Sequence, residues 1–380
     1  MSSEQNSKST NDGKSHLLKR IWRSVSVPFF AVILAGLIGA IILSASGANP
    51  WKAYVALAEG SFGNLAAWNQ GDLSALGRTL EKATPLIFSG LAVAFAFKAG
   101  LFNIGAQGQL LLGAIVAAVL GFGIHGLPPY IHAPLALLGG ALAGALYGAI
   151  PGALKTYSGA HEVITTIMLN YIAINITDYL ADGPWKDMTP GNIVARTPEI
   201  LNSARISSIN GLPLGFLIAL LFAVATWWLL WKTTLGFEIR TVGLNPNAAR
   251  YAGIKVARTV ILTMVISGLL AGIGGAIETQ GVVGRYQPGF NTGLGFDGIT
   301  IALLGKTHPI GVIPAAIIVG AMKAGSNHMQ YKAGVANDIV DVIQALILFF
   351  VAADGIVRWL LRMRVSDDEK ITLSTGWGQQ

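Results

Sequence analysis

Residues 259–280 read TVILTMVISGLLAGIGGAIETQ, with no charged side chain before Glu278. A helix needs about 20 mainly apolar residues to cross the hydrocarbon core of a bilayer. The stretch therefore predicts a transmembrane helix. Gly268 and Gly272 lie four residues apart, a spacing that lets a second helix approach closely in lipid. The same spacing recurs at Gly140, Gly144 and Gly148.

The composition of the whole chain agrees with that segment. Of its 380 residues, 53% are hydrophobic and 12% are charged, whereas a soluble domain carries about 25% charged residues. The mean hydropathy is +0.58. These values exclude a soluble cytosolic enzyme and a disordered chain. The chain has no Cys, which excludes a disulfide scaffold, a thiol nucleophile and a Cys-ligated metal site.

Recurrent apolar segments predict an all-α polytopic membrane protein with about ten transmembrane segments. The second and eighth are short, and short or broken helices occur in membranes where protein covers them. The first follows a polar stretch and lacks a clear cleavage site, which favours an anchor over a secretory signal. The predicted segments are 28–47, 84–98, 108–124, 134–154, 162–180, 213–231, 259–280, 296–305, 309–325 and 338–361.

The distribution of basic residues predicts the orientation. The chain has 26 Lys and Arg residues and a formal net charge of +7. With the N-terminus inside, 17 of the 26 basic residues fall in cytoplasmic stretches. Cytoplasmic loops of membrane proteins carry an excess of Lys and Arg. We therefore expect both termini to be cytoplasmic, and we interpret the positive charge as a topology signal with no implication of nucleic-acid binding.

One transmembrane domain, 25–364, is expected between two polar cytoplasmic tails, 1–24 and 365–380. Two long connections are predicted to be external, and the aromatic residues of the first suggest a helix at the outer interface. Each connection either anchors the protein in the interface or contacts an external partner. They are 48–83, with Trp51, Tyr54, Phe62 and Trp68, and 181–212, with Trp185.

Two motifs resemble nucleotide-binding sequences without their context. Residues 293–298 fit G-x-G-x-x-G, but no strand is expected before them. Residues 305–307, Gly-Lys-Thr, resemble the end of a P-loop but lack its first glycine, so we interpret them as a helix break. Asp338 and Asp341 are expected to complement the dipole at the start of the last helix. The chain shows no nucleophile–base pair and no metal motif, so no catalytic and no metal-binding residue is predicted.

Polar residues inside the predicted spans are more informative, because polar groups are costly in hydrocarbon. The stretch 100–109 contains three Gly, which predicts an interrupted helix, together with Asn103, Gln107 and Gln109. Glu162, Thr166 and Asn170 are spaced to share one helical face, and Glu278 and Gln280 end another span. Two readings stay open: these groups join helices by hydrogen bonds, or they line a path for a polar solute.

The predicted cytoplasmic segment 232–258 contains a short helix with clear start and stop signals. Asn245 and Pro246 are typical of a helix start, and Gly253 is typical of its end. The segment is either a plain connector or a docking element for a cytoplasmic partner.

Four blocks together resemble a known family. They are GLFNIGAQGQ at 100–109, HEVITTIMLN at 161–170, GLNPNAARYAGI at 243–254 and GFDGITIALLG at 295–305. In this order they resemble the membrane permease subunits of ABC importers of the branched-chain amino acid, ribose and nucleoside group. The second block is most similar to the nucleoside and simple-sugar branch. Gln107 and His161 depart from the family pattern, which usually has Glu and Asn there.

The resemblance implies partners and an energy source outside this chain. Two such permeases, identical or not, form the pore in the cytoplasmic membrane of a prokaryote, in contact with lipid. Two cytoplasmic ATPase subunits carry ATP and Mg, and a solute-binding protein or lipoprotein delivers the solute from outside. No cofactor is expected on this chain, which is a transport subunit and not itself an enzyme. The residues that match the family's ATPase-coupling loop are Gly243, Asn245, Ala248, Ala249 and Gly253.

We therefore expect a permease that works by alternating access, with a nucleoside as its best solute. A simple sugar such as ribose is the alternative. An ion-gradient-driven transporter would need paired acidic residues at mid-span, which are scarce, and an intramembrane enzyme would need a catalytic pair. The predicted path residues are Phe102, Asn103, Gln107, Gln109, Glu162, Thr166, Asn170, Glu278 and Phe296.

Overall fold

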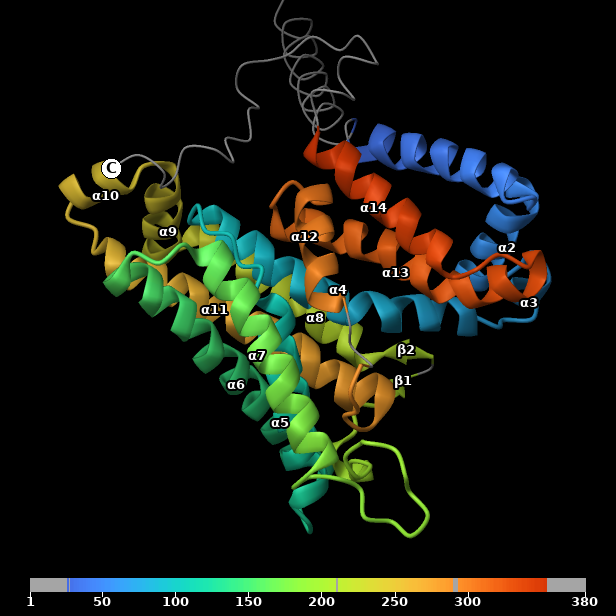
Figure 1. The fold of residues 1–380 in the computed structure, drawn as a ribbon, viewed down its shortest axis with the longest axis horizontal. Helices are drawn as coiled ribbons and strands as arrows, with labels where there is room; N and C mark the ends of the chain where they lie inside the picture. Colours follow the sequence, from blue (N-terminus) through green and yellow to red (C-terminus); the bar gives the residue numbers. More distant parts are fainter. Residues whose placement is uncertain (1–25, 27, 210, 290–292, 354–380) are drawn as a thin grey trace, which may run out of the picture.

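The computed structural model describes residues 26, 28–209, 211–289 and 293–353, and this part of the chain is almost entirely helical (Figure 1). Within it, eight helices are long and apolar enough to cross a bilayer, and each coincides with a predicted segment. The all-α prediction is thus confirmed, while the count of about ten stays a prediction. The eight are Pro28–Ala45, α4 (Ser74–Lys98), α5 (Ala106–Gly123), α6 (Pro129–Ser158), α7 (Glu162–Asp182), α8 (Leu214–Lys232), the run Val256–Val283 and α13 (Pro309–Ala333).

Shorter elements join these spans. The run Val256–Val283 consists of α11 (Val256–Ile277) and a π-helical end, η2 (Glu278–Val283). A small antiparallel hairpin pairs Ser208 with Pro213 and Ile209 with Leu212. The remaining elements are α2 (Pro50–Phe62), α3 (Leu65–Asn69), η1 (Asn202–Ala204), β1 (Ser208–Ile209), β2 (Leu212–Pro213), α9 (Thr234–Leu244), α10 (Pro246–Tyr251), α12 (Leu294–Leu304) and α14 (Asp338–Ala352).

Several predictions lie wholly or partly outside the described residues. They are the tails 1–24 and 365–380 and the end of the segment 338–361. The start of that last segment is described: α14 begins at Asp338 and has Asp341 in its first turn, as expected. Residues 305–307 form the predicted break, because α12 ends at Leu304 and the backbone then turns.

Helix α4 occupies the centre of the bundle. It packs against α2, α8, α11, α12 and α13, and every residue from Ala83 to Ala96 is buried. A helix that is apolar on all sides is stable only when protein or lipid surrounds it completely. The prediction that this span begins at residue 84 was wrong, since the helix starts at Ser74. The charged side chains Arg78, Glu81 and Lys82 hid its first turns from a hydropathy argument.

Glycine contacts join α5, α6 and α11. A Cβ atom built on Gly272 of α11 would lie 2.5 Å from the carbonyl oxygen of Gly140 and 3.0 Å from the Cα of Gly144. One built on Gly113 of α5 would overlap the carbonyl of Gly272. Only residues without a side chain permit this approach, in which close backbone packing supplies the attraction between helices. The packing role predicted for these glycines is confirmed.

The predicted loop 48–83 is largely helical, because it contains α2, α3 and the first turns of α4. Trp51 and Trp68 are exposed, and the Tyr54 hydroxyl donates a 2.6 Å hydrogen bond to the carbonyl of Gly36. The segment 181–212 holds η1 and β1 between irregular stretches. Whether both segments are external remains a prediction.

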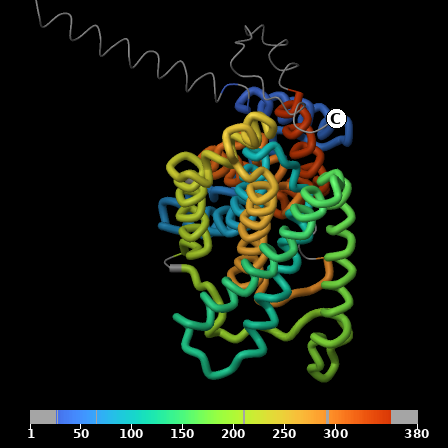
Figure 2. Tube along the Cα trace, turned by 90° about the vertical axis from the view of Figure 1, so that its left-hand side faces the viewer, coloured from blue at the N-terminus to red at the C-terminus, as the bar shows by residue number. Residues whose placement is uncertain are grey.

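The molecule has two different ends. Helix α9 lies beside the end of α4, where a Cβ on Gly243 would overlap the carbonyl of Lys98. Helix α3 lies beside the beginning of α4 (Figure 1). Figure 2 shows α9 and α10 at the top and the α5–α6 connection at the bottom, in agreement with Figure 1. The α9–α10 segment and α3 therefore lie at opposite ends of α4.

We predict that Gly272→Ala destabilises the fold, because its methyl group would overlap the α6 backbone. The expected loss is about 1–3 kcal/mol, typical of overpacking, and it is measured as a lower melting temperature in detergent. Gly36→Ala is the matched control, because nothing lies within 4 Å of a Cβ built there. Equal melting temperatures of the two variants would contradict the glycine packing.

Candidate functional site

The predicted helix interruption is real and carries a network of amides. Helix α4 ends at Lys98 and α5 begins at Ala106. Between them, the buried Asn103 donates to Gln109 Oε1 at 2.9 Å and to Ser267 Oγ at 2.7 Å. Gln109 returns a 3.2 Å bond to Asn103, and Ser267 donates to the carbonyl of Ala92 at 2.6 Å. These bonds join the break to α4 and α11.

Helix α7 is attached to the same break through Asn170. Its Oδ1 accepts from the backbone N–H of Gly108 at 2.8 Å, and its Nδ2 donates to the carbonyl of Ile104 at 3.0 Å. Gln107 Oε1 accepts from the N–H of Gly295 at 2.8 Å, which attaches the start of α12. Asn170 therefore satisfies two backbone groups at the break between α4 and α5, and Gln107 satisfies one at the start of α12, groups that helix ends leave unpaired.

The predicted common face of α7 is confirmed, since Glu162, Thr166 and Asn170 are all buried. Thr166 donates to the carbonyl of Glu162 at 2.7 Å. The Glu162 carboxylate pairs with Lys155 of α6 at 2.5 Å, and both side chains are less than a tenth exposed. A buried carboxylate is tolerated only when a partner compensates its charge.

The π-helical end of α11 holds two more buried polar side chains. Gln280 donates to the carbonyls of Ala133 and Ala204 at 3.0 and 2.8 Å. Glu278 is 4% exposed, and within the described residues its Oε2 atom has no hydrogen-bond partner. Short π-helical stretches often occur at functional sites. Glu278 is thus the predicted path residue whose hydrogen bonding is left incomplete.

The two predicted aromatic residues are placed differently. Phe102 is half-buried and its ring lies edge-on to that of Phe97, with 4.7 Å between the ring centroids. Phe296 is 43% exposed on α12. Phe102 is thus engaged in packing, and the ring of Phe296 lies at the surface of the chain.

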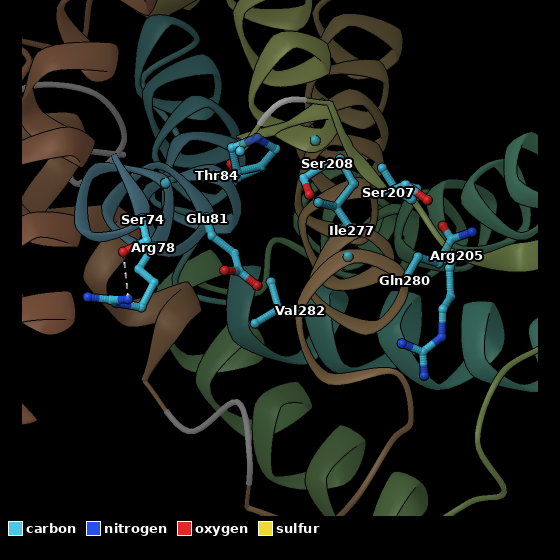
Figure 3. Close-up of a pocket in the computed structure, with 16 residues that line it drawn as sticks. Ser74, Arg78, Glu81, Thr84, Arg205, Ser207, Ser208, Ile277, Gln280 and Val282 are labelled. Carbon is cyan, nitrogen blue, oxygen red and sulfur yellow. Dashed lines mark hydrogen bonds between the residues drawn. The ribbon is translucent and has the colours of Figure 1, made fainter. Parts of the chain in front are cut away.

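A cavity of about 540 Å³ opens between the first half of α4, the segment 205–215 and the end of α11 (Figure 3). Small-molecule sites typically have volumes of roughly 300–1,000 Å³. Among the described residues, none of the nine predicted path residues lines it. Sequence reasoning missed the cavity, because its walls come from two segments interpreted as loops. Its charged and hydroxyl-bearing side chains are Ser74, Arg78, Glu81, Thr84, Arg205, Ser207 and Ser208.

The α9–α10 segment has the predicted caps and one additional helix. Asn245 Oδ1 accepts from the N–H groups of Asn247 and Ala248, both at 3.0 Å, which starts α10. Gly253 has a φ of +82° just after α10, a conformation suited to glycine. Helix α9, in contrast, was not anticipated.

The predicted coupling residues fall into two groups. Ala249 is fully buried and Gly243 is packed against Lys98, so neither residue offers a side chain for contact with a partner. Ala248 and Asn245 are exposed. Two large apolar side chains that we did not predict, Leu244 and Tyr251, are 85% and 94% exposed.

A cluster around Trp231 attaches this segment to the bundle. Lys98 Nζ and the Arg240 guanidinium lie 5.7 and 5.8 Å from the centroid of the Trp231 ring, within range of cation–π attraction. The His308 ring is 4.9 Å from it. Burial, and then the charge of Lys98, lower the pKa of His308, so this ring is neutral at pH 7. The four residues come from α4, α8, α9 and the α12–α13 turn, so no local pattern could reveal them.

The chain matches the family model described as the branched-chain amino acid transport system / permease component over residues 75–352. It is 42% identical to the guanosine ABC transporter permease protein NupP of Bacillus subtilis, over 91% of this chain and 96% of that protein. It is 37% identical to the nucleoside ABC transporter permease protein NupB of Lactococcus lactis, over 89% and 93%. It is 33% identical to the glucose ABC transporter permease protein TsgB13 of Haloferax volcanii, over 87% of each.

We predict that Asn170→Ala lowers the melting temperature, because it leaves the N–H of Gly108 and the carbonyl of Ile104 unpaired. Each unsatisfied buried group costs about 1–3 kcal/mol. Asn175→Ala is the control on the same helix, since Asn175 is exposed and, among the described residues, its side chain bonds only to the carbonyl of Tyr171. An Asn170→Ala variant that loses solute uptake but keeps its melting temperature would contradict the packing role.

Proposed function

Because the chain belongs to the family of the permease component of branched-chain amino acid transport systems, we propose that it imports a nucleoside by alternating access. It is the membrane subunit, and ATP hydrolysis takes place on a separate subunit. The observation that carries the nucleoside assignment is the 42% identity to a guanosine permease over 91% of this chain.

In this proposal the chain crosses the membrane ten times. The eight long helices are joined by α12 and α14, which are short but packed against α13. The α9–α10 segment is cytoplasmic, and so are both termini. The end of the molecule that carries α9 also carries many basic residues, which supports this orientation. They are Lys98, Lys155, Lys232, Arg240, Arg250, Lys255, Arg258 and Lys306.

The ATPase docks on α10 and the adjoining end of α9. Leu244 and Tyr251 supply exposed apolar contacts, and Asn245 holds the start of α10. The Trp231 cluster connects this segment to Lys98 at the end of α4. Movement of the ATPase subunits therefore reaches the central helix directly. A ligand shifts such an equilibrium only by its differential contacts with the two states, and the docking segment provides those contacts.

The full assembly contains two permease subunits, two ATPase subunits with ATP and Mg, and an extracytoplasmic solute-binding protein or lipoprotein. The second permease is either identical or homologous to this chain. The membrane is the cytoplasmic membrane of a prokaryote. Nucleic acid is not a partner.

The second candidate solute is a simple sugar, favoured by the 33% identity to a glucose permease. The same machinery would serve both. An ion-gradient-driven mechanism is disfavoured, because Glu162 pairs with Lys155 and the charge of Lys82 acts on the buried Glu278 more strongly than that of Glu81 does.

The deciding experiment is uptake of radiolabelled guanosine into proteoliposomes that contain the complete complex. We expect uptake that needs ATP inside the vesicle and the binding protein outside, with unlabelled nucleosides competing and ribose or glucose failing to compete. Uptake without ATP would contradict an ABC importer. ATP-driven uptake of sugar alone would replace the nucleoside by the sugar.

We predict that Tyr251→Asp uncouples transport, because it places a charge in the apolar contact with the ATPase. An interface residue of this kind contributes about 2 kcal/mol, so binding of the ATPase should weaken about 30-fold. Pull-down of the ATPase and ATP-driven uptake measure the effect. Tyr331→Asp is the control, since Tyr331 is 89% exposed on α13. Equal uptake by both variants would remove α10 from the docking surface.

A further inference from the structure

We propose that the cavity beside Glu81 is a solute site that binds the ribose hydroxyls of a nucleoside. The inference rests on the proposed function. It adds which part of this chain binds the solute and which part of the solute is bound. The cavity lies at the beginning of α4, whereas the Trp231 cluster lies at its end. In the proposed orientation, it therefore faces the side from which the solute arrives.

The cavity leads from the surface to the core of the bundle. At its rim, Arg78 and Ser208 are exposed, while Thr84 and Ile277 in its wall are each 2% exposed. Thr84 is followed directly by the part of α4 that is buried on all sides. A molecule in this space would thus contact the central helix, and not only the outer surface.

Glu81 is the carboxylate in the wall of this cavity. It is half-buried, and its carboxylate points into the open space toward Val282 (Figure 3). Within the described residues it has no hydrogen bond and no ion pair, and the charges of Lys82 and Arg78 act on it only from a longer distance. Arg78 donates to Ser74 Oγ at 3.5 Å, and Arg205 pairs with Glu199. A half-buried carboxylate without a donor favours a ligand that supplies donors.

A second carboxylate lies behind the cavity wall. Glu278 follows the wall residue Ile277 along the chain, is buried, and interacts electrostatically with Lys82 and, less strongly, with Glu81. Its Oε2 atom lacks a hydrogen-bond partner among the described residues. Unpaired carboxylate oxygens are acceptors, and hydroxyl groups donate hydrogen bonds to them without adding charge.

A ribose diol fits this arrangement of acceptors. Its two adjacent hydroxyls can donate to the two oxygens of one carboxylate, and acidic side chains hold ribose hydroxyls in this way in dinucleotide sites. The hydroxyls of Ser207 and Ser208 lie across the cavity from Glu81 and can both donate and accept. The described lining contains no aromatic ring to stack on a base. The contacts therefore point to the sugar.

The test compares two solutes that share a base, guanosine and 2′,3′-dideoxyguanosine, in the complete complex in proteoliposomes. The preference for guanosine is the ratio of the two ATP-driven uptake rates. We expect Glu81→Gln to lower this ratio about tenfold, the effect of losing one hydrogen bond to a charged group. The same binding protein serves wild type and variant, so its own preference cancels. Asp182→Asn is the control, because Asp182, the last residue of α7, is an exposed carboxylate that pairs with Lys186 just after the helix.

The outcomes separate this proposal from the proposed function. A wild-type complex that takes up no nucleoside would overturn both. A wild type that takes up guanosine, with a Glu81→Gln variant that keeps the wild-type ratio, would overturn the cavity site alone. An equal loss of both solutes would also overturn it, because the loss would then come from assembly or docking. If Glu81→Gln does not assemble, Ser208→Ala on the same cavity decides by the same ratio.

Discussion

The close approach of α11 to α5 and α6 is the constraint on which the rest of the bundle depends. Backbone atoms meet at Gly113, Gly144 and Gly272, where no side chain fits. In lipid, such contacts must supply attraction that the hydrophobic effect does not provide between helices. Because α11 is fixed there, Ser267 can reach Asn103, and Ile277 and Gln280 are placed in the wall of the cavity. The amide network and the cavity therefore both depend on small residues on the same helices.

The sequence anticipated the helices and the polar residues but not how those residues are used. Hydropathy located eight of the described spans, and the glycines predicted the break before α5. Sequence patterns could not show which groups Asn103, Gln109 and Asn170 bond to, since the fold determines these hydrogen-bond partners. In the described structure the amides act as helix connections. A role along the solute path stays a prediction for them.

The elements that sequence reasoning missed are built from distant residues. Trp231 is contacted from α4, α9 and the turn before α13, and no spacing rule relates those positions. Glu81 was assigned to a loop, because it stands among charged residues at the start of a span. A charged first turn is compatible with a membrane helix that neighbouring protein surrounds. The burial of α4 could have been recognised only from its neighbours.

The burial of α4 also bears on how the lipid influences the transporter. The α9–α10 segment is attached through Trp231 and Lys98 to α4, the candidate span that is most buried within the described part of the chain. In the proposed mechanism, a movement of the cytoplasmic ATPase thus reaches the protein interior through α4. Bilayer thickness acts mainly on helices exposed to hydrocarbon. The proposed coupling through α4 is for that reason shielded from changes in lipid composition. Such changes would alter the resting tilt of the peripheral helices and leave the contacts between the α9–α10 segment and α4 intact.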